Sequence, residues 1–253
     1  MAGLIFDSAG NLFGTTSVGG IQSAQCGCGT VFELSPPSEP GRAWLETVLY
    51  MFQGSPDGSQ PTAGVIFDSA GNLYGTTSAD GLYRAGAVFQ LTPPSFPGGA
   101  WTEKLIHSLL SIKDGSIPVA GLTLNGNTLF GTASQGGFYG EGTLFRLLPL
   151  PNPGGDWTYE VVHNFSGSDG ADPLAPLTFT GPSKGYGTTG GGKLGATLFE
   201  ISGSGNNVTY TLLYIFPAGS EPTTRLTVYG HALYVGTEGG GYKGNGSVYQ
   251  LGR

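Results

Sequence analysis

The sequence has little charge, few histidines and no long apolar runs. Only 11% of its 253 residues are charged, with a net charge of −7, whereas an average soluble domain is about 25% charged. No run of lysine or arginine occurs, which argues against nucleic-acid binding because neutralising phosphates requires a basic surface. No apolar run approaches the roughly 18 residues of a membrane span, so we expect no insertion into a membrane.

Low charge is more typical of an exported protein than of a cytosolic one, so we expect an extracellular or cell-surface location. Residues 1–7 lack the positively charged segment that begins a signal peptide. They already match the start of the repeat described below. We therefore expect either that a leader has been removed or that the chain is a segment of a longer product.

The three histidines and two cysteines form no metal-binding pattern. His107 and His163 occupy equivalent places in the repeat, His231 falls in a turn, and no two histidines have metal-ligand spacing. Cys26 and Cys28 share one loop, where a disulfide, which an exported protein favours, and a pair of free thiols are the alternatives. The sequence also lacks a Gly-x-Ser-x-Gly nucleophile motif. We predict no metal site built from these residues.

What the sequence does contain is a glycine-rich repeat. It has 47 glycines and 17 prolines, and a Gly-Thr-Thr marker or near variant recurs in steps of 61, 56, 56 and 49 residues. The markers begin at Gly14, Gly75, Gly131, Gly187 and Gly236. Self-similarity at such a period indicates a solenoid, an array or a propeller. A residue that breaks the repeat pattern is then a better functional candidate than one that recurs in every copy.

Each copy holds four short runs of β-branched and aromatic residues bounded by turn formers, which is the signature of β-strands. In the second copy these strands, called A to D, are residues 63–68, 72–78, 86–92 and 101–109. Residues 69–71, Ser-Ala-Gly, make a tight A–B hairpin. The fifth copy ends after strand C, so the count is 19 strands.

Four antiparallel strands repeated about five times suit radial packing of blades. We predict an all-β fold, a five-bladed β-propeller of four-stranded antiparallel blades whose last blade lacks its outer strand. All five copies would form one domain, with repeat units at about 1–52, 63–109, 119–165, 174–216 and 223–253. The unpaired edge of the last blade suggests edge-strand self-association as one kind of partner contact.

The repeat resembles a known family. Its pattern A-G-[LV]-I-F-D-S-A-G-N-L-[FY]-G-T-T, followed by G-T-[VL]-F-x-L, is similar to the GloVer tandem-repeat family of bacterial proteins with varied surface anchors. The match is most specific in the first three copies, and the fifth departs from it at Val235. The resemblance implies an exported bacterial repeat protein, and it implies no chemistry.

Residue chemistry varies most in the B–C loops, so we expect the ligand site on the face formed by these loops and the D–A links. Aromatic side chains there suit stacking on sugar rings, and polar ones suit bonding to hydroxyls; the alternative is that the rings pack between blades. We predict a lectin-like binding module for a glycan or small molecule. The candidate binding residues are Tyr83, Arg84, Tyr139, Glu141, Lys193, Tyr242, Lys243 and Asn245.

A hydrolase is the alternative function, of glycosidase, lactonase or esterase type. Acids at the mouth of a central channel would do acid–base work or hold Ca²⁺; we otherwise expect no cofactor. The candidates are Glu238, Glu141, Asp57, Asp114, Asp169 and Glu221. Three of these acids precede glycine in the repeat consensus, which favours carboxylates that cap their own turns. A purely structural or adhesive surface repeat is the third hypothesis.

Overall fold

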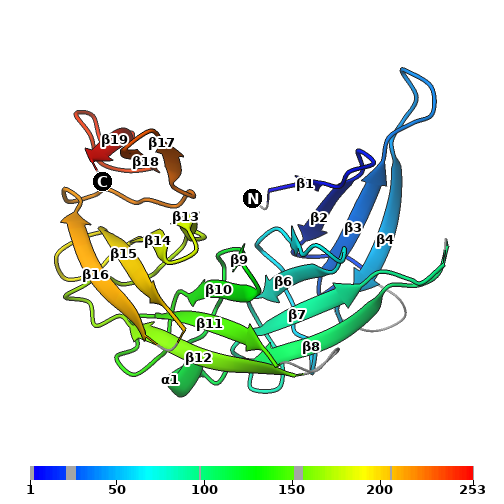
Figure 1. The fold of residues 1–253 in the computed structure, drawn as a ribbon, viewed down its shortest axis with the longest axis horizontal. Helices are drawn as coiled ribbons and strands as arrows, with labels where there is room; N and C mark the ends of the chain where they lie inside the picture. The colour runs from blue at the N-terminus through cyan, green and yellow to red at the C-terminus, as the bar shows by residue number, and fades with distance from the viewer. Residues whose placement is uncertain (1–2, 21–26, 97, 151–155, 206, 253) are drawn as a thin grey trace. The chain divides into compact units, whose positions relative to one another are not determined.

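The computed structural model describes residues 3–20, 27–96, 98–150, 156–205 and 207–252. In these residues the chain is all-β, with 19 strands and one four-residue helix, α1 (Ser111–Asp114). The strands form five antiparallel sheets, four with four strands and the last with three (Figure 1). The all-β prediction, the strand count and the three-stranded last sheet are therefore confirmed.

The chain divides into two compact units, Met1–Leu109 and Leu110–Arg253. That all copies form one domain stays a prediction. The first unit holds two sheets whose strands are paired in chain order. They are β1 (Ile5–Phe6), β2 (Leu12–Thr16), β3 (Thr30–Ser35) and β4 (Leu45–Met51), then β5 (Ile66–Phe67), β6 (Leu73–Thr77), β7 (Ala87–Thr92) and β8 (Thr102–Ser108).

The second unit holds the remaining three sheets, again with strands paired in chain order. The first is β9 (Thr123–Asn125), β10 (Thr128–Ala133), β11 (Thr143–Pro149) and β12 (Trp157–Asn164), and the second is β13 (Thr178–Gly181), β14 (Lys184–Thr189), β15 (Thr197–Ser204) and β16 (Asn207–Ile215). The third is β17 (Thr227–Tyr229), β18 (Ala232–Thr237) and β19 (Ser247–Gly252).

The A–B hairpins explain the repeated Asp-Ser-Ala-Gly-Asn segment. In the second sheet the Asp68 carboxylate accepts hydrogen bonds from the backbone N–H of Ala70 (2.8 Å) and Asn72 (2.9 Å), and from the Asn72 side chain (2.8 Å). Gly71 has a φ of 84°, which glycine adopts without strain. The Asp68 carboxylate thus accepts hydrogen bonds from backbone N–H groups within this short turn.

The marker glycine lies where an aromatic ring crosses the sheet. A Cβ at Gly75 would come 2.5 Å from the Phe89 ring, and one at Gly131 would come 2.4 Å from the Phe145 ring. These rings belong to strand C and lie directly opposite the glycines. Glycine at the marker therefore lets a buried phenylalanine pack flat against strand B.

In the structure the marker of the fifth copy begins at Val235, one residue before the Gly236 that the sequence pattern predicts. Val235 pairs with Tyr249, as Gly14 pairs with Phe32, so Val235 takes the place of the marker glycine. The Thr237 hydroxyl accepts from the backbone N–H of the opposing Ser247 (3.1 Å), as the last threonine of the first marker does from its own partner. The sequence-based alignment at Gly236 is therefore wrong, because the copy has no extra residue, only Val for Gly.

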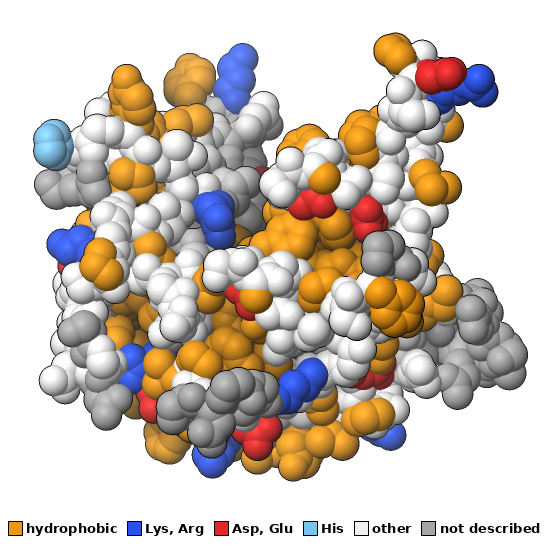
Figure 2. Space-filling model, turned by 45° about the vertical axis from the view of Figure 1, so that its right-hand side comes forward, with side chains coloured by type: hydrophobic (Ala, Val, Ile, Leu, Met, Phe, Trp, Pro, Cys, Tyr) orange, Lys and Arg blue, Asp and Glu red, His pale blue; other side chains and the backbone are white. Residues whose placement is uncertain are grey.

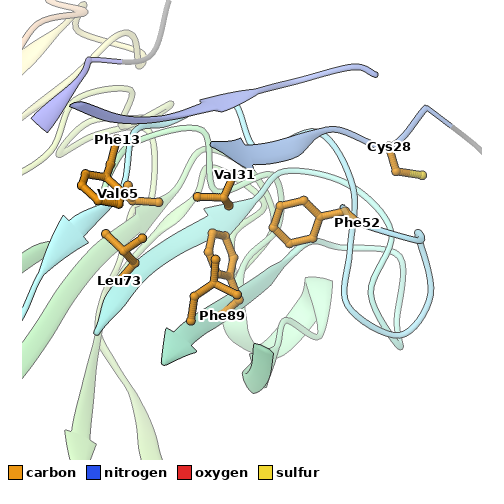
Figure 3. Packing of buried hydrophobic residues seen from close by; sticks show 8 residues of the cluster. Phe13, Cys28, Val31, Phe52, Val65, Leu73 and Phe89 are labelled. Atoms are coloured by element: carbon orange, nitrogen blue, oxygen red, sulfur yellow. The ribbon is translucent and has the colours of Figure 1, made fainter. Parts of the chain in front are cut away.

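Neighbouring sheets within the first unit pack face to face through apolar side chains. Phe13, Val31 and Phe52 of the first copy pack against Leu73 and Phe89 of the second (Figure 3). The Phe52 and Phe89 rings meet edge to face, with centroids 4.9 Å apart. Burying aromatic side chains of this size supplies most of the favourable free energy between sheets.

The three sheets of the second unit meet at their first strands. The Thr123 hydroxyl donates to the Leu177 carbonyl oxygen (2.9 Å), and the Thr178 hydroxyl donates to the Leu226 carbonyl oxygen (2.8 Å). Arg225 donates to the Thr123 hydroxyl (2.8 Å), which joins the third sheet to the first. The first strands of all three sheets are therefore in contact, and equivalent loops lie at the same ends of the sheets.

Candidate functional site

The predicted binding residues lie in the loops that join the second and third strands of the sheets. The aromatic rings there are exposed: Tyr83 is 57% exposed, Tyr139 is 59% and Tyr242 is fully exposed. Phe138 meets Tyr139 edge to face, with centroids 4.9 Å apart. The rings are therefore available to a ligand and do not pack between sheets, which was the alternative. Figure 2 shows hydrophobic side chains exposed among few charged ones on one side of the molecule.

The B–C loops are held in place by backbone hydrogen bonds, so they present these rings from a fixed frame. In the third sheet the Gly142 N–H donates to the Gly136 carbonyl oxygen (3.0 Å), which closes the loop on itself. The Phe138 N–H donates to the Asn164 side chain at the end of β12 (2.8 Å). A loop fixed in this way loses little conformational freedom when a ligand binds.

Two of the predicted binding residues come together in the second unit. A Cβ at Gly167 would lie 3.5 Å from Glu141 Oε1 and 3.5 Å from Lys193 Cγ, so both side chains flank this glycine. The Lys193 N–H donates to the Gly167 carbonyl oxygen (2.7 Å), and the Asp172 N–H donates to the Glu141 carbonyl oxygen (3.2 Å). We call Glu141, Gly167, Asp172 and Lys193 the Glu141–Lys193 site.

Sequence reasoning missed two members of this site, Gly167 and the second carboxylate, Asp172. Burial, and then the neighbouring Glu141 carboxylate, raise the pKa of Asp172. Asp172 has a φ of 52°, which a non-glycine residue rarely adopts. The signal in the sequence was the Asp before Pro173, where the first two copies have Gln60 and Ile117. The site thus offers two carboxylates that accept hydrogen bonds and an ammonium that donates them.

The other predicted binding residues stay apart from this site. Tyr83 and Arg84 lie in the B–C loop of the second sheet, in the first unit, and both are exposed. Lys243 and Asn245 lie beside Tyr242 in the loop before β19 and are exposed as well. Each group occupies the loop of its own copy, at the equivalent end of its sheet.

The acids of the Asp-Gly pairs close turns. Asp57 is buried and accepts from the Gln53 N–H (3.1 Å) and from the Tyr50 hydroxyl (2.7 Å). Asp114 is buried and accepts from the Leu110 N–H (3.1 Å). Both carboxylates therefore cap their own turns, as one of the two interpretations of the sequence predicts, and both are buried.

Asp169 caps the equivalent turn after the third copy and is more exposed. It accepts from the Ser166 N–H (2.8 Å) and bonds His163 Nε2 (2.8 Å). Burial alone would raise the pKa of Asp169, but the hydrogen bonds from Ser166 and His163 outweigh it and lower this pKa. An ionised, fully bonded carboxylate of this kind is a poor proton donor.

The last two acid candidates, Glu221 and Glu238, lie side by side on the surface of the last sheet. The Glu238 N–H donates to the Glu221 carbonyl oxygen (2.9 Å), and the Thr223 hydroxyl donates to Glu238 Oε1 (2.7 Å). With the fifth copy aligned on Val235, Glu238 takes the place of Ser17 of the first copy, directly after the last marker threonine.

Another acid, Glu103, was not among the candidates. Its Oε1 is buried and has no hydrogen-bond partner. Burial, and then the Asp57 carboxylate, raise the pKa of Glu103 to about 7. It stands two residues after the strand D tryptophan, where the first copy also has a glutamate, Glu46, and the third and fourth copies have Tyr159 and Tyr210. The change from glutamate to tyrosine between copies was visible in the sequence.

A groove in the first unit lies at the opposite end of the sheets, beside the proline-rich C–D loop. Its volume is about 660 Å³, within the range of small-molecule sites. It is lined by the backbone and side chains of both sheets, among them Glu33, Thr47, Pro94, Phe96 and Trp101. None of the predicted binding residues reaches it.

The described residues hold no group of three or more His, Cys, Asp or Glu side chains that could bind a metal ion. Cys28 is disulfide-bonded, which is one of the two alternatives for this loop, and Cys26 lies outside the described residues. No helix in the described part of the chain is long and apolar enough to cross a membrane.

The repeated sequence and the five equivalent antiparallel sheets define an all-β tandem-repeat protein. The chain belongs to the Gloeobacter/Verrucomicrobia repeat family, whose model matches residues 1–149. The match confirms the resemblance to GloVer-type repeats. Comparison with curated proteins finds none that matches the chain.

Proposed function

We propose that this protein binds carbohydrate through its B–C loops, as a lectin does. The observation that carries the proposal is that the B–C loop of every sheet exposes a large hydrophobic side chain. They are Val18, Leu82 with Tyr83, Phe138 with Tyr139, Leu194, and Tyr242. Exposed apolar side chains that gather into a patch mark a binding surface, and aromatic rings suit the apolar faces of sugars.

The Glu141–Lys193 site supplies the polar half of such a pocket. Its carboxylates would accept hydrogen bonds from sugar hydroxyls, and the Lys193 ammonium would donate to a ring or hydroxyl oxygen. Tyr139 lies two residues before Glu141 in the same loop, so a ring and a carboxylate are presented together. We therefore take this site, in the second unit, as the primary ligand site.

For the fold, we propose that the five sheets close into a five-bladed propeller. The support comes from the two end sheets, which expose apolar side chains that inner sheets bury. Leu4 is 49% exposed, whereas its equivalents Val65 and Leu177 in inner copies are 1% and 0% exposed. Val248 is 77% exposed, whereas its equivalent Leu198 is 1% exposed. Closure would bury both, and it would place all B–C loops on one face, where weak sites add to high avidity.

We also propose that the protein acts outside the cell or on its surface, in keeping with its low charge. The hydrolase alternative has less support, because three of its acid candidates cap turns. If the protein is a hydrolase, with or without Ca²⁺, the carboxylates to test are Glu141 and Asp172, because burial, and then the nearby Glu141 carboxylate, raise the pKa of Asp172.

A glycan array probed with the native protein and with three variants tests the proposal. We expect Tyr139→Ala and Glu141→Gln to lose binding to the glycans that the native protein retains. Lys184→Ala is the matched control, because Lys184 lies on strand β14 and pairs with Glu200 at 3.1 Å, away from the loops. Binding unchanged in both loop variants would refute the proposal, and turnover of glycoside or ester substrates lost in Glu141→Gln would favour the hydrolase.

A further inference from the structure

We propose that the groove in the first unit binds a small cation of the alkylguanidinium class. The groove lies between the first two sheets, and its volume is about 660 Å³. Its lining includes a carboxylate, a hydroxyl, an indole ring and two prolines: Glu33, Thr47, Trp101, Pro93 and Pro94. Because it lies beside the C–D loop, at the end of the sheets away from the B–C loops, it is separate from the sugar-binding surface proposed above.

At the equivalent position in the second unit the chain places a guanidinium group of its own. Arg146 directly follows the phenylalanine of strand C, as Glu33 does, so the two positions match. The Arg146 side chain is buried, pairs with Glu160 (2.6 Å) and donates to the Gly205 carbonyl oxygen in the turn before β16. A guanidinium therefore connects the third strand of one sheet to the C–D turn of the next.

The fourth copy also has a cation beside this position. Glu200 of β15 matches Glu33, and its carboxylate pairs with the Lys184 ammonium (3.1 Å) of the neighbouring strand. The first copy has Asn11 in the place of Lys184, and this amide bonds within its own A–B turn. Among the described residues no Lys, Arg or His pairs with Glu33, whose carboxylate accepts from the Ser35 hydroxyl (3.0 Å). Glu33 is thus an anion for which this part of the chain supplies no cation.

The other walls of the groove suit a flat cation that only donates hydrogen bonds. The Trp101 ring is held by Phe13, with centroids 6.2 Å apart, and a guanidinium stacks on tryptophan more readily than an ammonium does. Pro93 and Pro94 have no backbone N–H, so their backbone can only accept hydrogen bonds, as Gly205 does in the second unit. A guanidinium offers five donors and no acceptor.

The size and charge of the groove restrict the rest of the ligand. Sites for small molecules measure about 300–1,000 Å³, so the groove can enclose a molecule larger than the guanidinium itself. Val48 and Leu49 of β4 add apolar lining, which suits an alkyl stem. A carboxylate on the ligand would lie near Glu33 in a protein with a net charge of −7. We therefore expect an alkylguanidinium without an acidic group.

Isothermal titration calorimetry of the full chain with butylguanidinium tests the ligand class. We expect saturable binding, and binding weaker by about tenfold or more for butylurea, the neutral compound of the same shape, because hydrogen bonds between charged partners are the stronger ones. Butylammonium should bind less tightly than butylguanidinium, since it cannot stack as a plane. A capped Pro-Arg-Pro peptide that binds about tenfold tighter than butylguanidinium would overturn the assignment to a small molecule.

Two variants of the protein locate the site. Glu33→Gln keeps the shape of the side chain and should weaken binding by about tenfold or more. Glu46→Gln is the matched control, because Glu46 precedes Thr47 on β4 and does not line the groove. Circular dichroism should show both variants folded.

A double variant, Glu33→Arg with Thr47→Glu, transfers the ion pair of the second unit into the groove, since Thr47 matches Glu160. It should abolish binding while the protein stays folded, because the chain then supplies the guanidinium itself. No saturable binding by the native protein, equal binding of butylurea, or binding retained in Glu33→Gln or in the double variant would each overturn the proposal.

Discussion

The contact between two neighbouring sheets is built differently in the two units. In the second unit the Tyr210 hydroxyl donates to the Asp169 carbonyl oxygen (2.7 Å), and the Tyr210 ring stacks on His163 with centroids 3.8 Å apart. In the first unit Glu103 takes the place of this tyrosine, opposite Asp57. The second copy thus has a carboxyl with a buried oxygen that lacks a hydrogen-bond partner. At the same position the fourth copy has a phenol whose hydroxyl is hydrogen-bonded.

The repeat therefore specifies a backbone and an apolar core but leaves the polar contacts between sheets free to vary. An unpartnered buried oxygen costs about 1–3 kcal/mol, whereas a satisfied hydroxyl contributes about 1 kcal/mol. The first unit therefore carries a local penalty that the second does not. Variants at matched positions measure this penalty against the shared core.

The largest expected effect tests whether the shared core is equivalent in the two units. Phe52→Ala and Phe165→Ala remove buried rings at matching ends of β4 and β12. Each should lower the free energy of unfolding of its unit by roughly 3–5 kcal/mol, because a cavity is left in addition to the lost burial. Urea denaturation followed by tryptophan fluorescence measures this. Losses that differ between the two by more than about 2 kcal/mol would show that the difference between the units extends into the core.

Removing the phenol from the second unit should have a smaller effect. Tyr210→Phe deletes the hydrogen bond to the Asp169 carbonyl oxygen and keeps the ring that stacks on His163. We expect a loss of about 1 kcal/mol, since the Thr197 hydroxyl also donates to that oxygen (3.2 Å). Glu103→Gln in the first unit is the comparison variant. A larger loss from Glu103→Gln than from Tyr210→Phe would reverse the inferred order.

Giving the first unit the residue of the second should stabilise it in a pH-dependent way. The pKa of Glu103 is about 7 in the folded protein against 4.5 for an ordinary glutamate. The folded state then holds more protons between these values, so its stability falls as pH rises from about 4.5 to about 7. Glu103→Tyr removes this loss, and its gain should be about 1 kcal/mol at pH 8, after allowance for partial exposure, and little at pH 4.

Denaturation midpoints of the native protein and of Glu103→Tyr from pH 4 to pH 8 measure this gain. Glu103→Gln should show the same pH dependence without the added phenol, since it also removes the titrating group. A gain for Glu103→Tyr that is constant across the pH range would mean that the phenol acts by packing alone and that the carboxyl carries no penalty.

The sequence predicted the features that local interactions determine and missed those that depend on packing between sheets. The A–B hairpin at Asp68 and the strand pattern are local, so the repeat alone predicted them, including the missing strand after β19. The proximity of Glu141 to Lys193 depends on how one sheet packs on the next. The sequence predicted only that both residues lie in loops of the same face, not that they are neighbours. Glu103 was overlooked because a carboxyl in strand D reads as a surface residue until its neighbour Asp57 is placed.

The marker shows the opposite error. Gly236 matched the Gly-Thr pattern, so the sequence alignment shifted by one residue to keep it. Pairing in the sheet fixes the true register through Val235 and Tyr249, because a one-residue slip would exchange the two faces of the strand. Amino-acid identity was a less reliable basis for this alignment than the alternation of buried and exposed side chains.

The smallest expected effect concerns the Glu141–Lys193 site, where the second unit has two acids close together. Asp172→Asn removes the charge of the group whose pKa burial and Glu141 raise, and asparagine tolerates the positive φ of this position. The free energy of unfolding should rise at pH 7 by at most about 0.5 kcal/mol, because the pair is near the surface. The gain should vanish at pH 3, where the Asp172 carboxyl, with its raised pKa, is protonated. Asp80→Asn is the control in the first unit, since Asp80 also has a positive φ, 55°. A loss of stability in Asp172→Asn at pH 7 would mean that the ionised carboxylate is bonded rather than repelled, and the site would then be organised around Lys193 instead.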